Sequence, residues 1–149
     1  LCHRHDIPVV PLVGPSSLML ALMASGLEGQ RFAFGGYLPA RPDARRAALR
    51  AAEQRSARLQ ESDLFIETPY RNDVLLADML RVLSPATRLC LAADLTLPTQ
   101  SIRTRTVAGW QKEAPVIGKR PCVFILLAGA AGREKDGVQR PSGRTNKKT

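Results

Sequence analysis

Short apolar runs alternate with amphipathic and polar stretches along this chain. Runs rich in Val, Ile and Phe and bounded by Pro, Gly or Asp are typical of buried strands. The pattern predicts five such strands, and a sixth short strand in which Ile alternates with Arg. The five cover residues 7–12, 31–37, 64–66, 87–93 and 122–128, and the sixth covers residues 101–106.

Helical patterns fill most of the intervals between these strands. Ser16 or Ser17 can cap a first helix that is apolar nearly all round and is therefore expected to be buried. Asp43 can cap a long helix rich in Ala and Arg, and Trp110 is expected to pack inward from a short one. The four helices cover residues 17–25, 43–60, 73–83 and 107–113.

This alternation predicts an α/β domain with a mixed sheet flanked by helices. Antiparallel pairing is expected where connections are short, as between the last strands. The glycines within residues 31–37 suggest that another backbone or a ligand approaches closely there. Residues 129–149 are rich in Gly, Lys and Arg and are expected to be a disordered tail.

Composition limits the class of protein. The chain has 149 residues, of which 44% are hydrophobic, which suffices for one compact domain. No segment approaches the ~20 apolar residues that cross a bilayer, and the first residues lack a signal-peptide pattern, so we expect a soluble cytoplasmic protein. Cys2, Cys90 and Cys122 fit no disulfide framework or zinc site, and His3 and His5 are expected to be exposed.

The formal net charge of +9 favours partners rich in phosphate. Six basic and two acidic residues lie between positions 129 and 149, so the rest of the charge belongs to the body. Six arginines also lie on or just before the helix over residues 43–60. They form either a solvated basic face or a contact for RNA or phosphate. These are Arg41, Arg45, Arg46, Arg50, Arg55 and Arg58.

Four polar or glycine-bearing turns are candidates for chemistry, because ligands in open α/β sheets lie beyond the carboxyl ends of the strands. Each turn alone is also explained as an ordinary strand-to-helix connection. Glu67 and Asp94 are the carboxylates that could accept a proton. No Gly-x-Gly-x-x-Gly or P-loop motif occurs. The turns cover residues 14–17, 35–39, 67–71 and 94–96.

The amino-acid sequences of these segments, and their order along the chain, resemble those of a known protein family. Five segments resemble the tetrapyrrole (corrin/porphyrin) methylase family of S-adenosylmethionine (SAM)-dependent methyltransferases. Within it they are most similar to the branch that holds the ribose methyltransferases of small-subunit rRNA. The resemblance covers residues 5–128. The segments are Ile-Pro-Val-Val-Pro-Leu-Val-Gly-Pro-Ser-Ser (7–17), Arg-Phe-Ala-Phe-Gly-Gly-Tyr-Leu-Pro (31–39), Phe-Ile-Glu-Thr-Pro-Tyr-Arg (65–71), Asp-Leu-Thr (94–96) and Arg-Pro-Cys-Val-Phe-Ile-Leu-Leu-Ala-Gly (120–129).

The resemblance implies two α/β subdomains with SAM in the cleft between them. Residues 14–128 are similar to the second, C-terminal subdomain, and residues 1–13 to the end of the first subdomain and a linker strand. The opening strand and the Gly/Asp/Pro-rich SAM loop of the family have no counterpart in the sequence. We therefore expect an N-terminally truncated fragment that contributes half of a SAM site and does not work as a methyltransferase alone.

The family's cofactor contacts transfer by motif to five positions. Ser16 and Ser17 match the pair that contacts SAM after the Gly-Pro turn. Glu67 and Leu95 match contacts that are made through backbone, and Pro121 matches a residue that packs near the adenine. No catalytic residue is assigned and no metal is expected.

The resemblance leaves the acceptor open between rRNA ribose and a small molecule, and it implies a homodimer if the protein is full length. Tyr70 stands where the rRNA branch has histidine, and residues 94–98 replace a Glu-Leu-Thr-Lys-type run. Two alternatives are kept. One is a noncatalytic basic module associated with RNA through residues 41–58 and the tail, and the other is a nonfunctional remnant.

Overall fold

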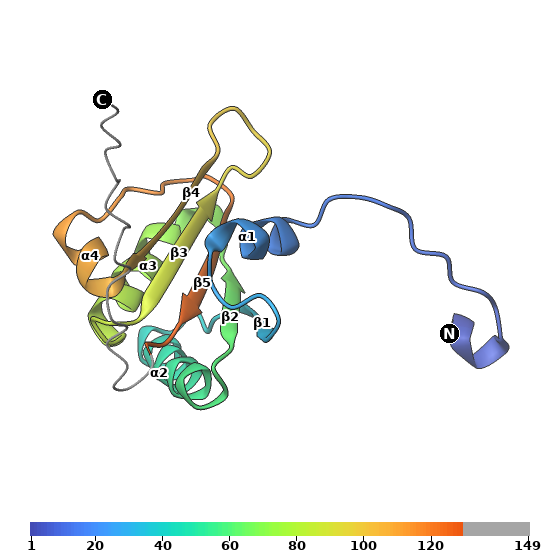
Figure 1. Ribbon diagram of the computed structural model, residues 1–149, viewed down its shortest axis with the longest axis horizontal. Helices are drawn as coiled ribbons and strands as arrows, with labels where there is room; N and C mark the ends of the chain where they lie inside the picture. The colour runs from blue at the N-terminus through green and yellow to red at the C-terminus, as the bar shows by residue number, and fades with distance from the viewer. Residues whose placement is uncertain (130–149) are drawn as a thin grey trace, which may run out of the picture.

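A five-stranded mixed sheet forms the centre of the computed structural model, which describes residues 1–129 (Figure 1). The strand order is β1-β2-β5-β3-β4. β1 and β2 are parallel, whereas β5 is antiparallel to both β2 and β3, and β3 is antiparallel to β4. The predicted α/β class with a mixed sheet is confirmed. The strands are β1 (Phe32–Tyr37), β2 (Ser62–Ile66), β3 (Arg88–Ala93), β4 (Ser101–Thr106) and β5 (Cys122–Leu127).

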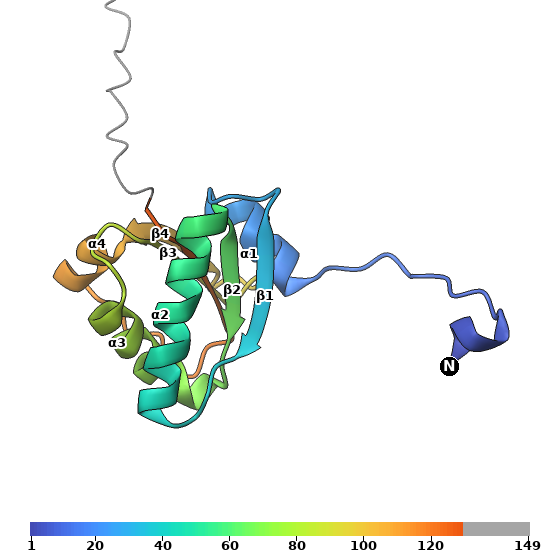
Figure 2. The same ribbon diagram turned by 90° about the horizontal axis from the view of Figure 1, so that it is seen from below.

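Two layers of helices cover the sheet, one on each face (Figures 1 and 2). Successive residues of a strand point to opposite faces, so each central strand serves two cores. Phe124 and Leu126 of β5 join the core beneath α2, α3 and α4, and Val123 and Ile125 join the core beneath α1. This double burial explains why β5 is apolar throughout. The helices are α1 (Ser17–Ser25), α2 (Pro42–Leu59), α3 (Asn72–Val82) and α4 (Val107–Lys112).

The helix boundaries agree with the predicted ones to within two residues, but two details differ. Asp43 is not the cap of α2: the N-cap position is Arg41, which makes no side-chain cap bond, and Pro42 begins the helix with its fixed φ. A proline at the first position thus takes the role that was expected of an aspartate. Thr106 caps α4 through its side chain, which accepts a hydrogen bond from the Gly109 N–H.

Helix α1 is only half buried, contrary to the expectation from its apolar sequence. Ala21 and Leu22 are buried against the sheet, whereas Met19 and Met23 are 41% and 70% exposed. The helix packs on one face of the sheet, and no other element of residues 1–129 covers its outer side (Figure 2). An apolar helix can be buried all round only when it has neighbours on both sides.

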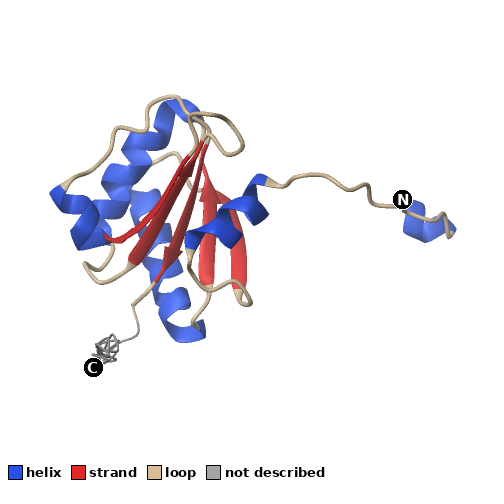
Figure 3. Ribbon diagram, turned by 45° about the horizontal axis from the view of Figure 1, so that its top comes forward, coloured by secondary structure: helices blue, strands red, loops and turns tan. Residues whose placement is uncertain are grey.

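Residues 7–12 do not form the expected strand. They run away from the sheet as an extended segment after the short 3-10 helix Cys2–His5 (Figure 3), and Val10 and Leu12 are 77% and 92% exposed. A strand exists only where a neighbouring strand supplies hydrogen-bond partners. None of the five strands pairs with this segment within the part of the chain that the structure describes.

The arginines of α2 do not form one solvated face. Arg45 is buried, and its guanidinium lies 2.6 Å from the Asp78 carboxylate of α3, which also accepts a 2.7 Å hydrogen bond from Arg46. Burial alone would raise the pKa of Asp78, but the hydrogen bonds from Arg46 and Arg45 outweigh it and lower the pKa. Arg55 pairs with Glu61 and with the buried Asp63 of β2. These three arginines hold the fold together, which weakens the interpretation of α2 as an RNA-binding face.

Other predictions are confirmed. Cys90 and Cys122 are buried thiols, and Trp110 is buried with its indole N–H donating a 2.8 Å hydrogen bond to the Leu89 carbonyl. The close approach expected at the glycines of residues 31–37 occurs at Gly35, but the neighbour is a side chain rather than a backbone or a ligand: a Cβ there would overlap the ring of Phe65. No helix within residues 1–129 has both the length and the apolar character needed to cross a membrane. The predicted disordered tail lies outside the described residues, apart from Gly129.

Candidate functional site

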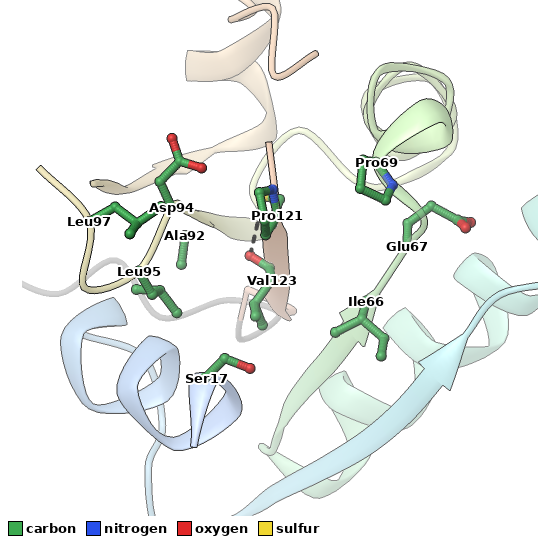
Figure 4. Close-up of a pocket in the computed structure, with 11 residues that line it drawn as sticks. Ser17, Ile66, Glu67, Pro69, Ala92, Asp94, Leu95, Leu97, Pro121 and Val123 are labelled. Atoms are coloured by element: carbon green, nitrogen blue, oxygen red, sulfur yellow. Dashed lines mark hydrogen bonds between the residues drawn. The ribbon is translucent and has the colours of Figure 1, made fainter. Parts of the chain in front are cut away.

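A cavity of about 250 Å³ opens at one end of the sheet (Figure 4). β2 and β3 end there, β5 begins there because it runs antiparallel to both, and the first turn of α1 faces the same space. This is the edge at which open α/β sheets bind ligands. The lining residues are Ser17, Ile66, Glu67, Pro69, Ala92, Asp94, Leu95, Leu97, Pro121, Cys122 and Val123.

Four of the five residues that the resemblance selected lie around this cavity. Ser17 comes from α1, Glu67 follows β2, Leu95 follows β3 and Pro121 precedes β5. Ser16 is the exposed N-cap residue of α1 and is not among the lining residues. Positions up to 104 residues apart in the sequence are thereby collected in one place. Their contacts with SAM remain a prediction.

Most of the wall is apolar. Ile66, Ala92 and Val123 project from the ends of three adjacent strands, and Leu95 and Leu97 cover them from the loop after β3 (Figure 4). Ligand pockets are commonly built in this way, from apolar side chains with a few polar groups that set orientation. The strand residues could not be predicted as lining residues from the sequence, because an apolar side chain at the end of a strand looks the same as one in the core.

Asp94 is held by its own loop and by the segment that leads into β5. Its Oδ2 accepts a 2.6 Å hydrogen bond from Arg120 Nε and a 2.9 Å bond from Thr99 Oγ1, and its backbone N–H donates to the Pro121 carbonyl at 2.9 Å. Arg120 first, and then Thr99, lower the pKa of Asp94. Its carboxylate points away from Leu95 and Ser17 in Figure 4. Asp94 therefore fixes the loop against the start of β5 and is a poor proton acceptor at neutral pH.

The loop after β3 is also strained. Asp94 and Thr96 both have left-handed backbone conformations, with φ of 52° and 70°. Such conformations are unfavourable for residues other than glycine and persist where the surroundings enforce them, often at ligand sites. Leu95 lies between these two residues and lines the cavity, so the strained backbone positions a lining residue.

Glu67 presents backbone rather than carboxylate to the cavity. Its Oε1 accepts a 2.7 Å hydrogen bond from the Thr68 N–H, and its buried Oε2 lies 3.0 Å from Arg71 Nη2 without a well-aligned hydrogen bond. The side chain points away from Ala92 and Val123 (Figure 4). The backbone contact with SAM stays a prediction, and the orientation of the carboxylate removes Glu67, like Asp94, as a base aimed into the cavity.

Two polar residues that the sequence analysis missed fasten the loop before β5. Asn72 is fully buried at the start of α3, and its amide donates to the Gly118 carbonyl at 3.1 Å and the Arg120 carbonyl at 2.7 Å. The Asp73 carboxylate accepts hydrogen bonds from the N–H groups of Ile117 and Gly118. Their partners lie more than 40 residues away, so no local pattern pointed to them.

Cys122 lines the cavity but is not suited to be a nucleophile. Burial raises the pKa of its thiol to about 12, so the reactive thiolate is scarce at neutral pH. With both carboxylates turned aside, the cavity is a binding surface rather than a set of acid-base groups.

The chain is similar in sequence to known rRNA methyltransferases. The chain is 35% identical over 138 residues to "Ribosomal RNA small subunit methyltransferase I" of Escherichia coli O157:H7. The aligned region covers 91% of this chain and 46% of that protein. The chain is 38% identical over 126 residues to the protein of the same name from Pseudomonas aeruginosa, covering 83% and 43%. The chain is a homologue of these methyltransferases.

The chain thus spans about half the length of the curated relatives that it matches. No protein-family model matches it. Among solved structures, the methyltransferase CobJ has the same fold over 88% of this chain and 55% of its own, with a TM-score of 0.54 and 17% identity. The resemblance inferred from the sequence is confirmed by the relatives, and the fold class by the structure.

Proposed function

We propose that this chain forms one wall of the SAM site of a methyltransferase that acts on small-subunit rRNA. The observation that carries the proposal is the convergence of Ser17, Glu67, Leu95 and Pro121 on one cavity at the ligand-binding edge of the sheet. The names of the relatives support the reaction and the rRNA acceptor. Of the acceptors that the resemblance leaves open, the names of the relatives favour rRNA, for which the acceptor atom would be a ribose oxygen.

The size of the cavity supports a shared site. At about 250 Å³ it is smaller than the roughly 300–1,000 Å³ of typical ligand pockets. We propose that residues 14–128 are the second subdomain and that residues 1–13 lead to it from the end of the first, which supplies the opposite wall. The exposed apolar side chains of residues 7–13 are consistent with a further partner surface.

The residues of the wall fit SAM in chemical character. The apolar strand ends offer a dry surface for an adenine ring, and the Ser17 hydroxyl and the backbone around Glu67 and Leu95 offer hydrogen bonds for its polar groups. When bound, SAM supplies a methyl group on a positively charged sulfur. Positioning accounts for much of the rate of such a transfer, because aligned reactants avoid the entropic cost of encounter. Since the carboxylates of Glu67 and Asp94 point away from the other lining residues, we place the proton acceptor outside this wall.

Two further proposals concern the whole protein. The outer face of α1 and the edge strand β1 expose Met23 and Phe34, at 70% and 50%, and large exposed apolar surfaces commonly mark interfaces. We propose that this surface contributes to a homodimer of the full-length protein. An rRNA acceptor also fits the cytoplasmic location expected from the sequence.

The test is a titration of SAM by calorimetry into a chimera. Residues 1–149 are joined to the part of the Pseudomonas aeruginosa relative that the alignment does not cover, so that both walls are present. We expect binding, and loss of that binding in Ser17→Tyr, because the larger side chain occupies the cavity from an exposed position that tolerates it.

The matched control is Ser84→Tyr, which places the same side chain at an exposed turn outside the cavity. It should bind SAM as the unaltered chimera does. A folded chimera that binds no SAM, or Ser17→Tyr with unchanged affinity, would overturn the proposal.

A further inference from the structure

Tyr70 and Lys119 form an exposed pair beside the cavity. The Lys119 ammonium nitrogen lies 5.0 Å from the centre of the Tyr70 ring, which is within the range of a cation–π interaction. The Tyr70 side chain is nevertheless 78% exposed, so most of the ring remains open to solvent. An aromatic ring held in place but left uncovered is a surface on which another flat group can stack.

The pair is placed next to the cavity by both of its chain segments. Pro69 precedes Tyr70 and lines the cavity, and Pro121 lies two residues after Lys119 and lines it too. Tyr70 belongs to the short 3-10 turn Pro69–Arg71, which leads directly into α3. A group stacked on Tyr70 would therefore adjoin a molecule bound in the cavity.

The same buried residue holds the two segments together. Asn72, two positions after Tyr70, donates hydrogen bonds to the carbonyl groups on either side of Lys119, those of Gly118 and Arg120. Arg71 also ties the turn to the Glu67 carboxylate and the Pro39 carbonyl. Tyr70 and Lys119 thus project from anchored backbone, so little conformational freedom is lost when a ligand binds.

Local charge leaves Lys119 available for an anionic partner. Each neighbouring carboxylate has its own partner: Glu67 contacts Arg71, Asp94 contacts Arg120, and Asp73 accepts backbone N–H groups. Within residues 1–129, Lys119 makes no ion pair. An ammonium group beside an open aromatic ring suits a nucleotide, which combines a flat base with a phosphate.

We infer that Tyr70 and Lys119 form a stacking platform for an unpaired base of the RNA acceptor, next to the methyl-transfer cavity. The inference rests on the proposed function for its choice of RNA. Proteins recognise single-stranded RNA largely by stacking splayed-out bases on aromatic side chains, whereas the bases of a duplex are already stacked on one another. The platform therefore distinguishes unpaired from paired RNA.

The experiment compares the affinities of residues 1–149 for a short unstructured RNA and for a duplex of the same length, by fluorescence anisotropy at fixed salt. The basic residues after position 129 are the same in every variant, so a change in the ratio of the two affinities from one variant to another reports on the substituted residue. We expect Tyr70→Ala to lower this ratio about tenfold, and Tyr70→Phe to keep it, because the ring is retained.

Two controls match these changes. Phe32→Ala removes another exposed ring, at the far end of β1, and Lys112→Ala removes another exposed lysine, on α4. Both should leave the ratio unchanged, whereas Lys119→Ala should lower it, because Lys119 holds the Tyr70 ring in place and contacts the phosphate of a nucleotide only when its base is stacked there. The platform is contradicted if Tyr70→Ala keeps the ratio of the unaltered chain, if Phe32→Ala lowers it equally, or if the unaltered chain does not bind the single strand.

The SAM titration separates this result from the proposed function. Tyr70→Ala in the chimera should bind SAM with unchanged affinity, since Tyr70 does not line the cavity. A chimera that fails to bind SAM while Tyr70→Ala lowers the RNA ratio would contradict the methyltransferase site and leave the platform standing.

Discussion

Two apolar segments of this chain look alike in sequence and differ completely in structure. Residues 7–13 and β5 are both short and rich in Val, Ile and Leu, and buried strands were expected over residues 7–12 and 122–128. β5 is buried at every position, whereas residues 7–13 are exposed throughout. An apolar run forms a buried strand only where other segments supply hydrogen-bond partners along its edges and apolar side chains over its faces.

β5 has such partners on all sides. β2 and β3 supply hydrogen bonds along its two edges, and helices cover both of its faces. Residues 7–13 have no such neighbours among residues 1–129. The cavity lies at the start of β5, so the best-packed strand of the molecule also supports the candidate site.

The sharpest test of this contrast uses one substitution at two places. Leu126 of β5 is fully buried and Leu12 is 92% exposed. We expect Leu126→Ala to lower the free energy of unfolding by about 3–5 kcal/mol, because it removes buried methyl groups and leaves a cavity. Leu12→Ala should change it by no more than about 0.5 kcal/mol. Urea unfolding of both variants measures the difference, and equal effects would break the comparison.

The contribution of a charged side chain to stability should likewise depend on whether it has a buried partner, with a somewhat smaller effect on the free energy of unfolding. Asp78→Asn leaves the buried Arg45 without its countercharge, although Arg45 keeps a 2.8 Å hydrogen bond to the Ala40 carbonyl. We expect a loss of about 3 kcal/mol in the free energy of unfolding, at the low end for broken buried pairs. Asp43→Asn, at a carboxylate that is 99% exposed, is the control and should be nearly neutral. A neutral Asp78→Asn would show that the pair is dispensable.

The smallest expected effect on the free energy of unfolding comes from the contact between Asp94 and the segment at the start of β5. The pKa of Asp94 is lowered in the folded chain by Arg120 and then Thr99. Ionised Asp94 therefore stabilises the fold above the ordinary aspartate pKa of about 4, and this contribution is lost as the pH falls through the folded-state value. The difference in unfolding free energy between the unaltered chain and Asp94→Asn should shrink on acidification. A difference that does not vary with pH would contradict the assignment.

Local patterns predicted a large part of the fold and of the site. Apolar runs such as residues 122–128 and amphipathic patterns such as residues 73–83 predict strands and helices, because their signals lie within a few residues. The turns that contain Ser17, Glu67 and Leu95 were predicted from their positions beyond strand ends, whereas the choice of these residues within the turns, and of Pro121, came from the family resemblance. The ion pairs of Arg45 and Arg55, and the anchoring by Asn72, were not predictable, because they join segments whose proximity only the fold establishes.

The central claim is that SAM binds against the ends of β2, β3 and β5. It is tested most directly by titrating SAM into ¹⁵N-labelled chain of residues 1–149 and following each backbone amide by NMR, which detects the weak binding expected of one wall. The account predicts that the amide signals of Ser17, Glu67 and Leu95 shift together as SAM is added, while those of Val74 and Arg81 on α3 stay in place. Shifts confined to residues outside the cavity, or no shifts at any SAM concentration, would contradict it.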